Sequence, residues 1–275
     1  MMQLESEMNK MYSIRPNQIL QAAKSHGIDE FHLDMPPVVM LTFNKTILDE
    51  LQRVCRMTEW NWLGWNYSPY AVPRKAMKGR FNDTEVAVLI PPMGASPLVA
   101  LCEELIFFGT SLIFLLCASW SLGEEYLERG EIHLPSFSVG LDGTSPHYGN
   151  RLGRVIAEPQ AHQALLNTLT EFDVSYKVGG IGTCEALYRI TRDLMQNYSD
   201  LGCLSMDNGE TAALYSLARM SNTKIGVLLQ PYIDLTKGWD VSFLNDDYRD
   251  TCRIQAQVAL ESANKIGTTS PEDSQ

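Results

Sequence analysis

The sequence has little positive charge. Its 275 residues include 22 Lys and Arg against 33 Asp and Glu, which gives a formal net charge of −11 at pH 7. The basic residues are scattered along the chain and form no cluster that could neutralise a phosphate backbone. We therefore expect no nucleic acid among the partners of this protein.

A long uninterrupted apolar run is also missing. The longest, from Leu105 to Leu122, is broken by Gly109, Thr110 and Ser111, so it predicts a helix end followed by a buried strand and no membrane span. The N-terminal stretch contains acidic side chains and lacks the apolar core of a secretory signal. These features predict an intracellular, cytoplasmic protein that does not bind membranes.

The cysteines and histidines lack the spacing of metal sites. None of the six cysteines forms a CxxC pair, and several lie in apolar segments, which favours buried free thiols over a disulfide framework or a metal site. His26, His32 and His162 have no companion at a metal-ligand spacing, and a structural role is expected for His133 within a strand pattern. The sequence predicts neither a metal nor a cofactor.

The residues that are present predict one α/β domain over residues 1–275, with an N-terminal arm (1–15) and a flexible tail (267–275). Strands are expected at 37–43, 85–92, 111–119, 131–140, 175–182 and 224–232, and helices at 47–55, 97–109, 159–172, 185–198, 210–220 and 246–266. This alternation predicts a three-layer α/β/α sandwich with a mixed, mostly parallel central sheet. In such sheets ligands bind at the carboxyl ends of the strands.

Four segments, in order, resemble the nucleoside phosphorylase superfamily, in the branch of uridine phosphorylase and bacterial purine nucleoside phosphorylase. They are "PPMGASPLVALCEELIFFG", "IFLLCASWSLG", "LDGTSPHYG" and "MDNGETAALYSLA". The resemblance covers roughly residues 36–265. It implies the fold of that superfamily, a small-molecule substrate and a homo-oligomer, which is a dimer, trimer or hexamer.

The phosphate site that the resemblance implies is not retained. The family places a glycine-rich turn with an arginine after the first strand, whereas "LTFNKTILDEL" has neither and offers only Lys45. The arginine expected on the third strand falls on Leu116, and Pro92 removes a backbone N–H from the turn that keeps Gly94. Burying an unpaired phosphate dianion here would cost several kcal/mol, so inorganic phosphate is not expected to be a substrate.

The resemblance implies that part of the sugar site is kept. Glu210 matches the glutamate that holds the ribose hydroxyls in the family, with Gly209 where methionine is usual, and Ser119 keeps a hydroxyl at the tip of the third strand. Glu210 is also explained as a helix N-terminal carboxylate behind an Asn208 cap. Both roles remain open.

The acid that assists the departing base is missing. Purine-specific members follow the sixth strand with Ser-Asp, where this sequence has Gln230 and Pro231. Asp234 lies three residues further on and could reach inward or remain a solvated loop carboxylate. Glu185 matches a position near the base and could equally cap a helix.

The substitutions make the predicted pocket more apolar and less charged, and Trp120 is added at a strand tip. His147 and Tyr148 can donate hydrogen bonds to a neutral carbonyl or hydroxyl, although a structural role fits His147 equally well. The segment 58–73 adds five aromatic residues, for which core packing, a subunit interface and a neighbouring active site are alternatives. They are Trp60, Trp62, Trp65, Tyr67 and Tyr70.

Three functions follow as hypotheses. The first is a repurposed, cofactor-independent cyclase or isomerase of secondary metabolism, for example of Diels–Alder type, which acts on a neutral apolar molecule through shape and a few hydrogen bonds. The second is an N-glycosidase or phosphorylase that cleaves a modified nucleoside, and the third is a non-catalytic binding protein. The candidate catalytic residues are His147, Tyr148, Glu210 and Asp234, and the candidate substrate-binding residues are Met93, Gly94, Leu116, Ser119, Trp120, Glu185, Tyr188, Gln230 and Tyr232.

Overall fold

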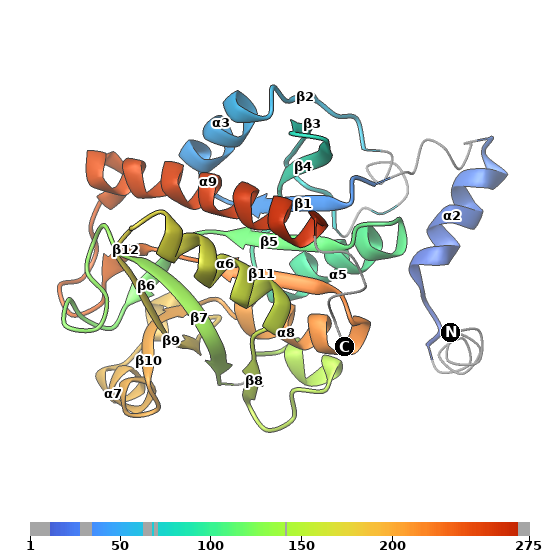
Figure 1. Cartoon of the computed structure of the whole chain (residues 1–275). Coiled ribbons are helices and arrows are strands. Elements are labelled where there is room, and N and C mark those ends of the chain that lie inside the picture. Colours follow the sequence, from blue (N-terminus) through green and yellow to red (C-terminus); the bar gives the residue numbers. More distant parts are fainter. Residues whose placement is uncertain (1–11, 28–34, 63–67, 69–70, 141, 269–275) are drawn as a thin grey trace, which may run out of the picture.

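The computed structural model describes residues 12–27, 35–62, 68, 71–140 and 142–268. Two six-stranded sheets lie at its centre, with the strand orders β11-β5-β1-β4-β3-β2 and β12-β6-β10-β9-β7-β8 (Figure 1). The first sheet contains β1 (Val38–Thr42), β2 (Thr58–Glu59), β3 (Lys75–Phe81), β4 (Thr84–Ile90), β5 (Leu112–Leu116) and β11 (Lys224–Leu228). The second contains β6 (Ser119–Ser121), β7 (Ile132–Val139), β8 (Arg154–Ile156), β9 (Tyr176–Thr183), β10 (Cys203–Asp207) and β12 (Pro231–Asp234).

Most strand pairs in the middle of the sheets are parallel. β1 pairs in parallel with β4 and β5, and β9 pairs in parallel with β7 and β10. An isolated bridge between His133 and Leu229 joins the two sheets. The α/β class and the mostly parallel pairing are confirmed, and the expected central sheet is divided into two.

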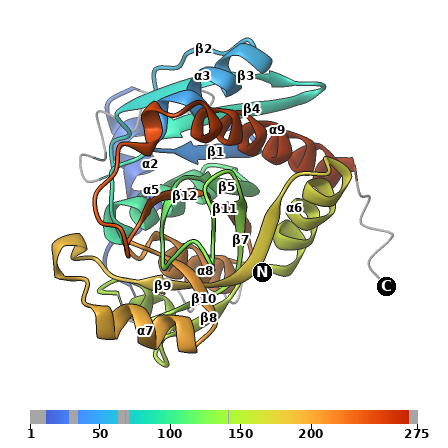
Figure 2. The ribbon, with the colours of Figure 1, turned by 90° about the vertical axis from the view of Figure 1, so that its left-hand side faces the viewer.

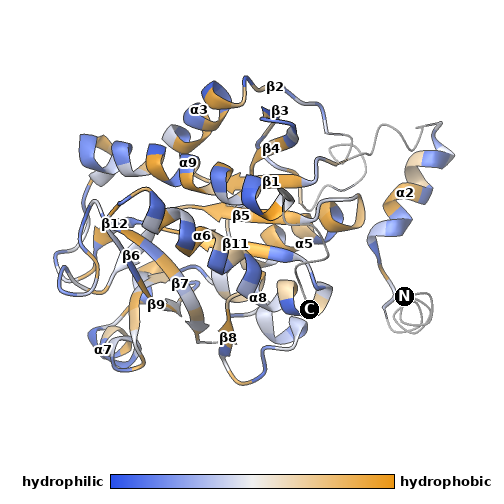
Figure 3. Cartoon of the chain, in the orientation of Figure 1, coloured by the Kyte–Doolittle hydropathy of each residue, from blue (hydrophilic) through white to orange (hydrophobic). Residues whose placement is uncertain are grey.

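Helices cover both faces of the first sheet (Figures 1 and 2). The helices are α2 (Pro16–Ser25), α3 (Lys45–Val54), α5 (Ala95–Phe107), α6 (Pro159–Glu171), α7 (Arg192–Asp200), α8 (Glu210–Ser221) and α9 (Asp246–Thr268), with 3₁₀ turns η2 (Ser145–Tyr148), η3 (Leu187–Arg189) and η4 (Ser242–Leu244). One buried cluster joins α3, α6 and α9 to the sheet, and another joins α5 and α8 to its opposite face. Apolar residues accordingly concentrate in the central strands (Figure 3).

The strand β5 shows how this layering follows from the sequence. Its five residues are all apolar and all buried, because the strand is covered on both faces. Apolar and polar residues therefore do not alternate along it. Ile113 and Leu115 belong to the cluster under α5 and α8, whereas Phe114 and Leu116 belong to the cluster under α6 and α9. Neighbouring residues on β5 therefore face opposite layers.

One predicted helix begins later than expected. The interval 185–198 contains the 3₁₀ turn η3, and α7 begins only at Arg192. Thr191 ends the preceding loop, and its hydroxyl accepts the Leu194 N–H at 3.2 Å, which makes it the N-cap.

Several expectations about individual side chains can be checked directly. Cys55, Cys102, Cys203 and Cys252 are buried free thiols, and Cys117 and Cys184 are half-buried free thiols. Trp62 is fully buried in the core and Trp60 packs against the same cluster, so these two are packing residues. Trp65, Tyr67 and Tyr70, His32, and most of the expected arm and tail lie outside the described residues.

The described residues contain neither a membrane-spanning helix nor a metal-binding cluster of side chains. No helix there is both long and apolar enough to cross a membrane. Those same residues contain no group of three or more His, Cys, Asp or Glu side chains that could hold a metal ion.

Candidate functional site

A pocket of about 800 Å³ lies where β1, β5 and β10 reach their carboxyl ends. Its wall is mostly apolar. The apolar and aromatic lining residues are Phe43, Met93, Leu115, Cys117, Ala118, Trp120, Leu187, Leu229, Tyr232, Phe243, Leu244 and Tyr248. The polar ones are Asn44, Lys45, Thr46, Asp207, Asn208, Glu210 and Arg249. This composition suits an apolar ligand with a few polar groups.

Three rings on successive elements form one side of the pocket. Tyr232 stacks on Phe243 with the ring centroids 5.9 Å apart and an interplanar angle of 7°. Tyr248 meets the edge of Tyr232 at 6.1 Å. Because β12, η4 and α9 each contribute one ring, this aromatic wall exists only in the folded protein.

The turn after β1 faces the pocket with two of its backbone donors already used. Asn44 is the N-cap of α3, and its Oδ1 accepts the N–H groups of Thr46 at 2.8 Å and Ile47 at 3.3 Å. Its Nδ2 donates to the Tyr248 hydroxyl at 2.8 Å. A helix N-terminus binds anions through such N–H groups, and here the side chain of Asn44 satisfies two of them.

Glu210 is the first residue of α8 and points to the N-terminus of a second helix. It is 4% exposed, and its Oε1 accepts the Gly94 N–H, at the N-cap of α5, at 3.1 Å. Burial, followed by the charge of Asp207, raises the pKa of Glu210 to about 7.

The packing behind Glu210 explains why residue 209 is a glycine. Its φ is +92°, and a Cβ atom at this position would lie 2.9 Å from the Cβ of Asp142. A side chain such as methionine would therefore collide with Asp142 and strain the backbone.

Asp207 is the second carboxyl group of the pocket and closes β10. Its Oδ1 accepts the Gly209 N–H at 2.9 Å, and its Oδ2 accepts the Thr211 N–H at 3.0 Å. Burial raises the pKa of Asp207, and the nearby Asp142 raises it further. Asp142 is itself buried and accepts the N–H groups of Thr144 and Ser145.

The structure brings four of the predicted site residues to the pocket. They are Met93, Trp120, Glu210 and Tyr232. Gly94 contacts the pocket through its hydrogen bond to Glu210.

Three predicted residues are buried elsewhere, which corrects their placement. Leu116 is fully buried in the cluster under α6 and α9, whereas its neighbour Leu115 lines the pocket, because successive strand residues face opposite sides. Ser119 is 1% exposed, and its hydroxyl points to the Gln230 carbonyl at 3.5 Å. The Gln230 amide donates to Gln255 Oε1 at 2.9 Å and so anchors α9.

Four predicted residues lie toward the surface, away from the pocket lining. His147 is exposed on η2, and Tyr148 is half-buried there against the core cluster under α5 and α8. Glu185 is exposed and accepts the Gly143 N–H at 3.0 Å, so it fastens a loop. Tyr188 is 87% exposed, while its neighbour Leu187 lines the pocket.

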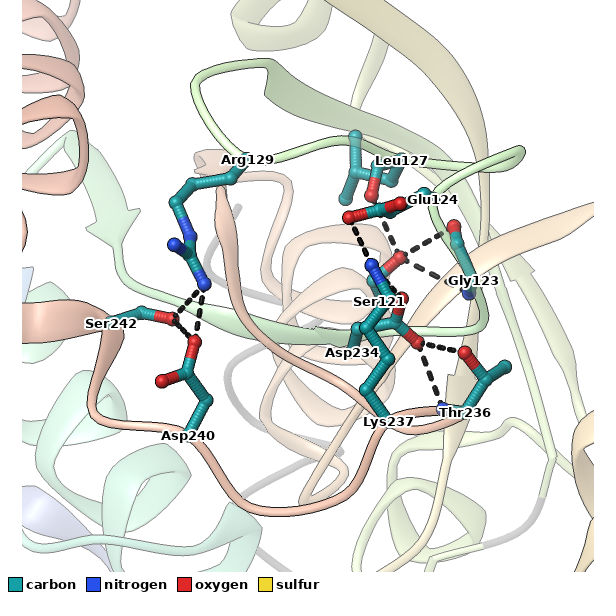
Figure 4. A network of polar contacts seen from close by, with 10 residues as sticks. All are labelled: Ser121, Gly123, Glu124, Leu127, Arg129, Asp234, Thr236, Lys237, Asp240 and Ser242. Atoms are coloured by element: carbon teal, nitrogen blue, oxygen red, sulfur yellow. Dashed lines mark hydrogen bonds and ion pairs between the residues drawn. The ribbon is translucent and has the colours of Figure 1, made fainter.

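Asp234 belongs to a separate polar network (Figure 4). Its Oδ1 accepts the backbone N–H of Thr236 at 2.8 Å and the Thr236 hydroxyl at 2.6 Å. Lys237, which ion-pairs with Glu124, has its Nζ 3.8 Å from Asp234 Oδ2. Asp234 therefore fastens the loop after β12 and does not line the apolar pocket.

Sequence reasoning missed Asp207, Asn44, Phe43 and two residues of the aromatic wall, Phe243 and Tyr248. Asn44 carried a usable signal, since an Asn directly before a helical pattern is a common N-cap. Asp207 did not, because β10 is short and mixes polar with apolar residues, so no strand was expected there.

The fold and the pocket define an α/β protein with an apolar pocket at the carboxyl ends of its strands. The chain belongs to the phosphorylase superfamily, whose family model matches residues 51–259.

Two solved structures of uridine phosphorylase from Vibrio fischeri ES114 are similar to this chain. One, complexed with 6-hydroxy-1-naphthoic acid, has a TM-score of 0.72 and 18% identity, with 86% of this chain and 94% of that chain covered. The other has the same TM-score and identity, with 85% and 94% covered. At this identity the likeness shows the fold alone. No curated protein sequence gives a significant match.

Proposed function

We propose that this protein is an enzyme of the phosphorylase fold that has lost phosphorolysis and that isomerises or cyclises a neutral, largely apolar small molecule without a cofactor. The observation that carries the proposal is the turn after β1. There the Asn44 side chain occupies two N–H groups of the α3 N-terminus, and no glycine or arginine is present to bind an anion.

The cations that line the pocket are engaged with carboxylates. Lys45 is 84% exposed and bonds Asp49 at 2.5 Å, and Arg249 lies 3.5 Å from Asp246. Among the described lining residues these two are the basic side chains, whereas a phosphate dianion needs several donors. The site therefore favours ligands without a phosphate group.

The apolar wall supplies what a cyclisation needs. A flexible substrate pressed against Trp120, Tyr232 and Leu115 is held in a reactive conformer, which removes entropy from the barrier. An intramolecular Diels–Alder cyclisation in secondary metabolism is a reaction of this kind. The complex of the uridine phosphorylase neighbour with 6-hydroxy-1-naphthoic acid supports the idea that this fold can accept a fused aromatic body.

Isothermal titration tests the binding part of the proposal. The panel contains inorganic phosphate, ribose 1-phosphate, several nucleosides and 2-acetylnaphthalene, and an assay for released base runs beside it. We expect binding of the naphthalene only. Ala118→Phe, which fills part of the pocket, is the control and should abolish that binding in a folded protein. Phosphate binding with base release would refute the proposal.

Turnover is tested by mass spectrometry. A neutral metabolite extract of the source organism is incubated with the protein and with Ala118→Phe. An isomerisation or cyclisation leaves the mass of the substrate unchanged and shifts its retention time, so we expect such a pair only with the unmodified protein. Saturable binding without any such pair would identify a binding protein instead.

A second candidate, cleavage of a modified nucleoside, is favoured by one observation. Glu210, which matches a ribose-binding glutamate, lines the pocket. Under this alternative Glu210→Ala abolishes nucleoside binding, whereas 2-acetylnaphthalene should still bind the variant with reduced affinity if the pocket serves apolar ligands.

The assembly and compartment are also proposals. Leu152 and Ile156, which flank and end the edge strand β8, are 95% and 74% exposed, which fits a homo-oligomer in which they are covered. The free thiols fit a reducing compartment such as the cytoplasm. Sedimentation of the purified protein tests the oligomer.

A further inference from the structure

Glu210 and Asp207 are neighbouring buried carboxyl groups, and the protein holds them differently. Each oxygen of Asp207 accepts one backbone N–H from the start of α8. Glu210 accepts the Gly94 N–H from another element through Oε1, and its own backbone N–H and the Asn208 side chain also act to lower its pKa. Backbone donors on both oxygens favour the charged form of a carboxyl group, so the geometry favours the charge on Asp207.

No cation compensates this pair within the described residues. From the loop before η2, Asp142 adds a third buried carboxylate, and Cys117, directly after β5, adds a thiol. Lys45 on α3 and Arg249 on α9 line the same pocket but pair with Asp49 and Asp246. Two adjacent carboxyl groups in such surroundings cannot both ionise easily, so one of them keeps a proton.

We propose that Asp207 is a positioning residue that carries the charge and holds Glu210 protonated, so that Glu210 donates an O–H hydrogen bond to a carbonyl oxygen of the ligand. This inference rests on the proposed function and names its ligand class. The ligand is a neutral apolar molecule with a carbonyl group, such as a ketone, quinone, lactone or amide.

The role of Glu210 differs from that implied by the family resemblance. A glutamate that holds ribose accepts hydrogen bonds from two hydroxyls and must be ionised. A protonated Glu210 donates, and a donor placed against a carbonyl draws electron density from it and activates an attached double bond. The sequence suggested His147 and Tyr148 for this task, but both lie outside the pocket lining, whereas Glu210 lies within it.

The protonation state can be measured directly in the intact protein. Glutamate labelled with ¹³C at the side-chain carboxyl is incorporated, and Glu210→Gln assigns the resonance. We expect a titration midpoint near 7, in line with the pKa of about 7 that burial and Asp207 produce. A midpoint below about pH 5.5 would overturn the inference without the need for any further variant.

Asp207→Asn tests the positioning role. Removing the charge should lower the Glu210 midpoint by at least about one pH unit, because a neighbouring negative charge disfavours ionisation. Asp83→Asn, which removes one negative charge from an exposed turn between β3 and β4, is the control and should leave the midpoint in place. If Asp207→Asn does not fold, Asp142→Asn is the substitute, with a smaller shift of the same sign.

A pair of probes tests the hydrogen bond itself. In 2-isopropenylnaphthalene a CH₂ group replaces the carbonyl oxygen of 2-acetylnaphthalene, so the two differ mainly in the acceptor. At about pH 5.5 we expect the ketone to bind roughly tenfold more tightly, as one good hydrogen bond allows. At about pH 8.5, where about 3% of a group with pKa 7 is protonated, the preference should disappear.

The outcomes separate the two proposals. Binding of both probes with no ketone preference at any pH would refute the inference and leave the apolar pocket standing. Binding of neither probe would refute the proposed function and the inference with it. Nucleoside binding that strengthens as the pH rises would show an ionised, accepting Glu210 and would also refute the inference.

Discussion

Tyr232 separates two cavities of opposite character. On one side lies the apolar pocket of about 800 Å³, and on the other a polar cavity of about 560 Å³. The polar cavity is walled by charged side chains that pair with each other, Arg129 with Asp240 and Lys237 with Glu124 (Figure 4).

The two cavities handle carboxyl groups in different ways. Asp240 and Glu124 lie beside cations, and the hydrogen bonds of Ser242 and the Val241 N–H lower the pKa of Asp240. Glu210, in the apolar pocket, accepts hydrogen bonds but has no cation beside it among the described residues, and burial raises its pKa to about 7. Charge is thus balanced by pairing in one cavity and by a retained proton in the other. The second arrangement leaves an acid that can donate to a ligand.

A cation in the buried layer next to the apolar pocket is expected to have the largest effect. Leu116→Arg restores the residue that the family resemblance implies, but the side chain is fully buried among apolar residues. Without a carboxylate partner the buried guanidinium should destabilise the fold by more than ~3 kcal/mol. Urea unfolding measures this, and Leu116→Met, expected to cost less than ~1.5 kcal/mol, is the control. A stable Leu116→Arg variant that binds phosphate would show that the anion site is recoverable.

The second-largest effect is expected when the titrating carboxyl group of Glu210 is removed. Since the pKa of Glu210 is raised from 4.5 to about 7, the folded state binds the proton more tightly, and its stability should fall as the pH rises through this interval. Glu210→Gln should remove that loss and stabilise the protein at about pH 8 by on the order of 3 kcal/mol. Urea unfolding at about pH 5 and about pH 8 measures the difference.

Glu104 provides the matched control for this experiment. It is also buried, and burial raises its pKa to about 7, so it contributes to the same decline in stability. Glu104→Gln should therefore reduce the pH dependence without changing the binding of 2-acetylnaphthalene, because Glu104 does not line the pocket. An unchanged pH dependence in Glu210→Gln would contradict the assignment.

Tyr232→Ala should join the two cavities. The ring contacts Phe243, Tyr248 and Trp239, so its loss should destabilise the protein by roughly 2 kcal/mol. It would also admit water to the apolar side, and 2-acetylnaphthalene should bind about tenfold more weakly. Calorimetry measures the binding. Tyr232→Phe retains the ring and should bind like the unmodified protein, and a loss of binding there would implicate the hydroxyl instead.

The smallest effect is expected from the polar side. Arg129→Met removes the contacts to Asp240 and Ser242. The side chains of Arg129 and Asp240 are each 42% exposed. Such pairs contribute less than ~1 kcal/mol, so thermal unfolding should shift only slightly. Asp240 and Ser242 lie in the segment that leads to Phe243 of the pocket wall. The affinity for 2-acetylnaphthalene should therefore fall by no more than about threefold. A larger fall would mean that the polar network controls the apolar pocket.

Much of the fold was predictable from local patterns. Apolar runs marked β1, β5 and β11, and helical periodicity marked α5 and α6, because these elements are long or continuously buried. The short strand β10 and the late start of α7 were missed. β10 has only five residues, in which apolar and polar side chains are mixed. So short a strand shows no recognisable two-residue period.

The site was predictable only in part. Of the residues singled out in the sequence, Glu210, Trp120, Tyr232 and Met93 line the pocket. Leu116 did not, because a shift of one residue along a strand exchanges its two faces, and the resemblance could not resolve that shift.

What the sequence alone determined are the α/β order of elements, the glutamate at the start of α8, and the absence of glycine and arginine from the turn after β1. What only the tertiary structure decided is how these groups behave. The cap of Asn44 on α3, the meeting of Tyr232 with Phe243 and the burial of Glu210 beside Asp207 all depend on distances across the fold. A pKa and a pocket wall arise from such distances and from excluded water, which no local pattern in the chain encodes.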